Sequence, residues 1–283
     1  MNAHEPTREE QLRAQLDDAP TIPVSEFKRR SRRSFLTGAA GLGAAYLGWN
    51  WLQDQPNVGG IPKPLRDQLE RNAGLRKDIE ALDSPVDVYL GAEVGYGWKT
   101  QTHGLTEGQK QQHGFQYAIG SHHSTYLREF DLEKVVRLQH EHHLKTCANP
   151  AMDILGHPWR FLYEEFKRCE WPWIDTMTCV PESLTRELAH AAVETGTAIE
   201  INATSNLCMK FQPDSYFEEY VAYLAVLAEE GVTFALGSDA HELHELKTSR
   251  LTWEVVDRLG IPDDRIWHPG VAAANRTGER DTR

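Results

Sequence analysis

The chain has 283 residues and a formal net charge of −12 at neutral pH. The acidic surplus argues against a nucleic acid partner, because phosphate backbones attract basic surfaces. Apolar residues make up 40% of the chain, enough for a sizeable core, and the four cysteines show no C-x-x-C pair. Reduced thiols are therefore expected rather than a disulfide framework.

The N-terminal part of the chain differs in character from the rest. Residues 1–34 are polar and end in a basic run, so we expect a disordered leader. Residues 35–52 carry no charge and predict an apolar signal or anchor helix. Residues 53–74 predict a linker with a short helix, and residues 271–283 a disordered tail.

The run Ser31-Arg32-Arg33-Ser34-Phe35-Leu36 resembles a twin-arginine export signal. Leader and linker together resemble the start of an exported molybdopterin oxidoreductase of the sulfite-oxidase type. This resemblance ends before any cofactor-binding segment and implies no molybdenum chemistry. It does imply a periplasmic protein, or one anchored to the inner membrane by residues 35–52. The alternative is a basic patch before an ordinary buried helix.

From residue 85 onward, short apolar runs end in polar or metal-capable clusters. There are five of them: VDVYL before Glu93, FQYAI before His122 and His123, MDIL before His157, TAIEI before Asn202, and VTFAL before Asp239 and His241. Helical patterns lie between most of these runs, at 131–144, 181–195, 214–230 and 247–259. Strands that alternate with helices predict a parallel α/β fold, open or barrel-shaped. In such folds the chemistry gathers at the C-terminal ends of the strands.

The clusters combine carboxylates and imidazoles without thiolates. Such ligands suit Zn²⁺, Mn²⁺ or Fe ions held for hydrolysis. Each motif alone has an ordinary alternative: Glu93 as a salt-bridged carboxylate, and His157 as part of a common Gly-His-Pro turn. Their coincidence at matching strand ends predicts a divalent metal site.

The segments GAE, IGSHH, DILGHPW, IEINATSN and GVTFALGSDAH follow one another in this order. Through them, residues 75–270 resemble the PHP family, metallohydrolases that include polymerase-associated and histidinol-phosphatase domains. The resemblance implies a distorted seven-stranded β/α barrel that holds up to three metal ions, usually for phosphoester hydrolysis.

Carried over motif by motif, the resemblance implies five metal ligands: Glu93, His123, His157, Asp239 and His241. Glu93, Asp239 and His241 are also the implied catalytic groups. Glu93, His123 and His157 would complete one metal site. His122 is a less favoured neighbouring ligand, and Asn202 is expected to shape the rim.

The chain departs from the family at its start, because only His4 precedes Glu93 and no His-x-His strand is present. The first two barrel strands are therefore expected to be missing. Either the loop residues His103 and His113 rebuild the site or activity is reduced; the alternative for both is an exposed loop position. Unpaired edges of an incomplete barrel would favour a homo-oligomer.

Arg160 follows the Gly-His-Pro turn and is expected to bind a substrate phosphate or to form a structural salt bridge. The helix histidines His140, His142 and His143 are expected on a solvated face, with a metal role as the alternative. The sequence thus predicts a metal-dependent phosphoesterase for a small phosphorylated substrate. The alternative is an inactive metal-binding or interaction remnant of a PHP domain. The family resemblance alone implies a cytoplasmic protein.

Overall fold

The computed structural model describes residues 72, 74–81, 87–97, 100–125, 127–241 and 243–269. The predicted leader, the apolar segment and the tail, together with nearly all of the linker, lie outside these ranges. Within the described ranges, no helix combines the length and the apolar character that crossing a membrane requires.

A six-stranded, mostly parallel sheet forms the centre of the fold. In sheet order its strands are β2 (Thr102–His103), β1 (Gly91–Gly97), β3 (Tyr117–Ser121), β4 (Ile154–Leu155), β5 (Ala198–Asn202) and β6 (Phe234–Gly237). Only β2 is antiparallel to its neighbour. The predicted α/β class is confirmed, and five strands run parallel as expected. The first of them lies later than predicted: residues 87–90 precede β1, which begins at Gly91, so Glu93 lies within the strand and not after it. The strand β2 was not predicted.

Helices connect and cover the strands. They are α5 (Glu107–Gln112), α6 (Leu132–Cys147), α7 (Tyr163–Arg168), α8 (Glu182–Thr195), α9 (Asp214–Glu229) and α10 (Ser249–Leu259). Shorter helical turns are η2 (Ala203–Leu207), η3 (Leu243–Thr248) and η4 (Asp263–Arg265).

Local sequence signals explain where the helices begin and end. The Asp131 carboxylate caps α6 by accepting from the backbone N–H of Lys134 at 3.1 Å. Gly196 ends α8 with φ +70°, a left-handed conformation that glycine adopts without strain. The four predicted helices are confirmed with small shifts at their ends, whereas α5 was missed because the segment before β3 lacks periodicity.

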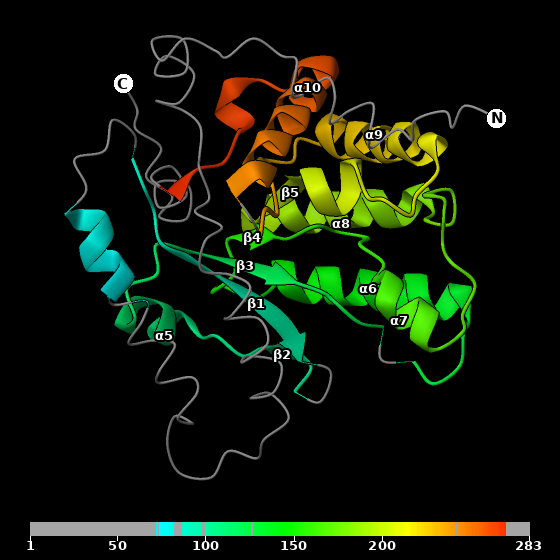
Figure 1. Ribbon diagram of the computed structural model, residues 1–283, viewed down its shortest axis with the longest axis horizontal. Coiled ribbons are helices and arrows are strands. Elements are labelled where there is room, and N and C mark those ends of the chain that lie inside the picture. Colours follow the sequence, from blue (N-terminus) through cyan, green and yellow to red (C-terminus); the bar gives the residue numbers. More distant parts are fainter. Residues whose placement is uncertain are drawn as a thin grey trace, which may run out of the picture.

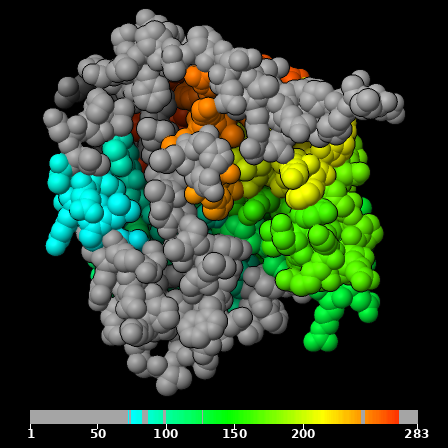
Figure 2. All heavy atoms as spheres, in the orientation of Figure 1, coloured from blue at the N-terminus to red at the C-terminus, as the bar shows by residue number. Residues whose placement is uncertain are grey.

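The two faces of the sheet are covered differently. Leu155, Ile199 and Phe234 form one lateral row and pack into the main core under α6, α8, α9 and α10. Figure 1 shows these helices side by side in that order, and Figure 2 shows the green and yellow parts of the chain packed as one block. The opposite face has a smaller core: Tyr117, Ile119, Ile154, Ala198, Ala235 and Trp267.

A buried ion pair joins α5 to the strands. The ammonium group of Lys110 contacts the carboxylate of Asp153, and both side chains are more than nine-tenths buried. The same carboxylate accepts a hydrogen bond from the backbone N–H of Ala118 at 2.8 Å. A buried charge is tolerated only when it is paired and hydrogen-bonded, so each partner requires the other.

Replacing Lys110 with Met is expected to lower the free energy of unfolding by about 3–5 kcal/mol, because Asp153 would keep a buried charge without a counter-ion. Urea unfolding measures the change. Adding Asp153→Asn should recover part of the loss, since no unpaired charge then remains. The exposed pair Arg258–Glu218 provides the control, and Arg258→Met should have a much smaller effect. Equal losses for Lys110→Met and Arg258→Met would contradict this account.

Candidate metal centre

Three neighbouring strands supply the candidate ligands. Glu93 lies within β1, His123 follows β3, and His157 follows β4. In the sheet, Glu93 pairs with Ile119 of β3, which pairs in turn with Ile154 of β4. Parallel pairing therefore brings the ends of β3 and β4 beside the Glu93 carboxylate, at the carboxyl edge where parallel α/β sheets carry ligands.

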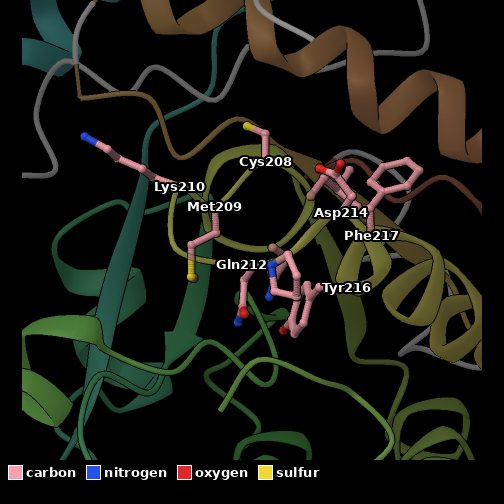
Figure 3. Close-up of a pocket in the computed structure, with 10 residues that line it drawn as sticks. Cys208, Met209, Lys210, Gln212, Asp214, Tyr216 and Phe217 are labelled. Carbon is pink, nitrogen blue, oxygen red and sulfur yellow. The ribbon is translucent and has the colours of Figure 1, made fainter. Parts of the chain in front are cut away.

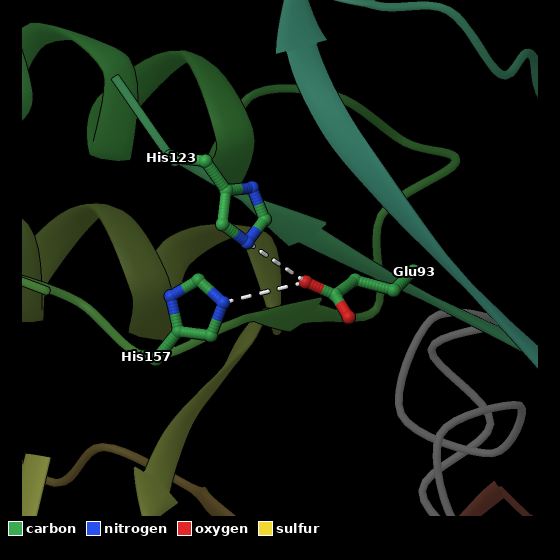
Figure 4. Close-up of side chains that lie close together, drawn as sticks. All are labelled: Glu93, His123 and His157. Atoms are coloured by element: carbon green, nitrogen blue, oxygen red, sulfur yellow. Dashed lines mark hydrogen bonds and ion pairs between the residues drawn. The ribbon is translucent and has the colours of Figure 1, made fainter. Parts of the chain in front are cut away.

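The three side chains converge on one point (Figure 4). Nε2 of His157 lies 3.3 Å and Nε2 of His123 lies 3.4 Å from Oε1 of Glu93. One ligand atom from each residue falls within 4.8 Å of the others. Two imidazoles and one carboxylate form the protein ligand set of many catalytic zinc sites, which leave a fourth position for water or substrate. The donor set fits a divalent ion.

Burial and mutual pairing set the charges of this cluster. Burial would raise the pKa of Glu93, but the hydrogen bonds from His123 and His157 hold it well below its usual value. Burial lowers the pKa of His123 to about 4, against the opposing effect of Glu93. For His157, burial would lower the pKa, but the hydrogen bond to Glu93 together with the charges of Glu93 and Asp239 raises it. A cation at this site would compete with a proton shared by Glu93 and His157.

The turn that carries His157 is held from several sides. His157 has φ +26° and Trp159 has φ +61°, values that L-residues seldom adopt. The Pro158 carbonyl between them accepts hydrogen bonds from the Asn206 side chain at 3.1 Å and from the Tyr220 hydroxyl at 3.0 Å. Strained backbone persists where its surroundings fix it, and these contacts do so here.

The segment that follows His123 is also held. Glu165 of α7 is buried and accepts from the Ser124 hydroxyl at 2.6 Å and from the Thr125 backbone N–H at 3.1 Å. The loop that presents His123 is thereby attached to α7.

Glu200 is a residue of the site that the sequence did not reveal. It lies on β5, is 6% exposed, and accepts from the backbone N–H of His157 at 2.7 Å. Burial raises its pKa to about 7, and the charge of Asp239 acts in the same direction. Glu200 was missed because it stands inside the apolar run TAIEI. The signal that could have revealed it is a carboxylate inside a strand that is otherwise apolar.

Asp239 and His241 do not belong to the converging trio. Asp239 accepts a hydrogen bond from the Ser205 hydroxyl, and its charge raises the pKa of His157, so it lies close by. His241 is exposed, and its Nδ1 lies 3.0 Å from the carbonyl oxygen of Asp239. The structure therefore places Asp239 beside the trio and His241 at the surface.

Asn202 is the last residue of β5, and Arg160 follows the turn that carries His157. The Asn202 carbonyl oxygen accepts from the backbone N–H of Ser205 at 2.8 Å and caps η2. Arg160 is half-buried, and its positive charge lowers the pKa of both His123 and His157. Its guanidinium forms no ion pair with the described residues, so the expected structural salt bridge is absent from this part of the chain.

His103 and His122 lie on the other side of the sheet from the trio, in a cluster of buried histidines. Nε2 of His103 lies 2.8 Å and Nε2 of His122 lies 3.0 Å from the Thr146 hydroxyl of α6. Nδ1 of His103 lies 2.8 Å from the Val94 carbonyl, an acceptor, so this nitrogen carries a hydrogen. Both rings are engaged here, and neither belongs to the converging trio.

The histidines of α6 complete this cluster. His140, His142 and His143 are all at least 95% buried, so the predicted solvated face is wrong. The ring of His142 stacks on that of His122 at 5.0 Å. The expectation of an exposed His103 is wrong as well, since it is 3% exposed. His113 lies elsewhere, at the end of α5 with its ring near Phe115.

A cavity of about 310 Å³ lies where η2 and the following loop meet the start of α9. Figure 3 shows Met209, Gln212 and Tyr216 around it. Its wall includes Asn206, whose amide group donates to the Pro158 carbonyl beside His157. A cavity of this size suits a small organic group.

Comparison of the chain with models of known protein families and with curated proteins finds no match.

Replacing His157 with Ala is expected to weaken Zn²⁺ binding by more than about 100-fold, because supporting residues alone contribute about 10- to 100-fold in metal sites. Equilibrium dialysis with metal analysis measures it. The wild-type protein should bind one ion per chain at this site. His113→Ala and His241→Ala provide matched controls that should keep that ion. If His241→Ala lost the ion while His157→Ala kept it, the assignment of His157 as a metal ligand would be contradicted.

Replacing Thr146 with Val is expected to lower the free energy of unfolding by about 1–3 kcal/mol, since two buried ring nitrogens would lose their partner. Thr146→Ser retains the hydroxyl and should lose less. Thermal and urea unfolding report the difference. A Val variant no less stable than the Ser variant would show that the hydroxyl is not needed.

Proposed function

We propose that this chain is a metal-dependent phosphoesterase of the PHP type, with the observed sheet as part of an incomplete, distorted barrel. The convergence of Glu93, His123 and His157 carries the proposal. Bound Zn²⁺, Mn²⁺ or Fe would polarise a phosphoryl oxygen and supply a nucleophilic water near neutral pH.

The residues around the trio have complementary roles in this proposal. Glu93, His123 and His157 would hold the ion. Asp239 lies close enough for its charge to act on His157, and its carboxylate would accept a proton from the metal-activated water.

The positive charge of Arg160 near the trio favours an anionic substrate. The whole chain is strongly acidic, so a phosphate needs a local positive charge to approach the site. Arg160 provides one near His123 and His157. Its planar guanidinium can donate two parallel hydrogen bonds to phosphoryl oxygens. The cavity beside Asn206 is our candidate for the organic part of a small phosphate ester.

The second candidate is a metal-binding protein without turnover. Two observations favour it: His241 lies at the surface, and a single ligand trio is found among the described residues. Hydrolysis measurements distinguish the two candidates.

Metal-loaded protein is expected to hydrolyse p-nitrophenyl phosphate, and Glu93→Ala should reduce kcat/KM to the background rate. Arg160→Met should raise KM by about 10- to 100-fold, the value of one or two charge-assisted hydrogen bonds. The KM of Arg160→Lys should lie between that of Arg160→Met and that of the wild type. Steady-state kinetics at several metal concentrations measure these values. Equal rates for wild type and Glu93→Ala would favour the protein without turnover.

A further inference from the structure

Glu200 and Glu93 are carboxylates on the same face of the sheet. Glu93 lies level with Ile119, Ile154 and, on β5, Ala198. Side chains alternate along a strand, so Glu200, two positions after Ala198, points to the face that bears Glu93. Unlike Glu93, it is not one of the converging ligand residues.

One oxygen of Glu200 holds the backbone of a candidate ligand. Its Oε2 accepts a hydrogen bond from the backbone N–H of His157 at 2.7 Å. His157 itself has the unusual backbone angle φ +26°. This bond fixes the peptide from which the His157 imidazole extends toward Glu93.

The other oxygen of Glu200 lies against Gly237 of β6. A Cβ added at Gly237 would overlap Oε1, and its three nearest atoms all belong to Glu200. Gly237 is not among the residues with positive φ, so its backbone would accept alanine. Glycine is therefore required here to leave room for the Glu200 carboxylate.

We propose that Glu200, seated on Gly237, is a positioning residue that sets the ligating geometry of His157. Its role rests on the proposed metal centre and acts through the backbone of His157, without contact to the ion. In metal sites, such supporting partners orient the ligands and strengthen binding.

The first test measures metal affinity and ligand geometry together. Glu200→Ala is expected to weaken Zn²⁺ binding by about 10- to 100-fold and to alter the visible absorption spectrum of the Co²⁺-loaded protein. Glu200→Gln retains an acceptor for the His157 N–H and should restore most of the affinity and the spectrum. Asp153→Asn, a change at a buried carboxylate away from the centre, controls for general destabilisation and should leave the spectrum unchanged.

The second test is a double-mutant cycle between Glu200 and Gly237. Gly237→Ala alone should weaken Zn²⁺ binding by displacing the carboxylate. In the Glu200→Ala background the same change should cost little, because the atoms that it would meet are gone. Contacting residues show this kind of non-additivity. Additive losses, or an unaltered Co²⁺ spectrum in Glu200→Ala, would overturn the proposal.

A third measurement does not depend on bound metal. In the metal-free protein, hydrogen exchange at the His157 amide should be slow in wild type and in Glu200→Gln and faster in Glu200→Ala. If wild type binds no metal, the proposed function fails while this measurement still decides the role of Glu200. Unchanged exchange in Glu200→Ala would refute it.

Discussion

The register of β1, β3 and β4 is the constraint on which the candidate metal centre depends. Glu93 is level with Ile119 of β3 and Ile154 of β4. The segments that follow these two strands therefore both begin near the Glu93 carboxylate. A shift of one residue would turn the Glu93 side chain to the helix-covered face. The small core around Ile119 and Ile154 and the large core beneath the helices both oppose such a shift.

One face of the sheet forms the main hydrophobic core, and the other carries the carboxylates of the candidate site. Leu155, Ile199 and Phe234 are buried under helices and need no polar partners. The opposite face accommodates the carboxylates of Glu93 and Glu200, and each accepts hydrogen bonds from its surroundings. Buried carboxylates destabilise a fold unless such partners exist, so the loops after β3 and β4 contribute to stability as well as to the site.

The sequence predicted the parts of the structure that follow from strand and helix periodicity. Apolar runs that ended in Glu93, His123 and His157 indicated parallel strands, and parallel strands bring such residues to one edge. Periodicity does not reveal what a polar residue faces. The pattern LQHEHHL looked like a solvated surface, yet Tyr96 and Trp159 cover its rings. Glu200 was hidden for the converse reason, as a charged residue in a strand that otherwise reads as core.

The buried imidazoles couple unfolding to proton uptake. Burial lowers the pKa of His103 and of His142 to about 4, whereas an unfolded histidine titrates near pH 6.5. Between these values the unfolded chain binds more protons than the folded one, so stability falls as the pH drops below about 6.5. The same rings that fill the space between β1 and α6 therefore make the fold acid-labile, which an acid titration of stability would show as a loss beginning well above the carboxylate range.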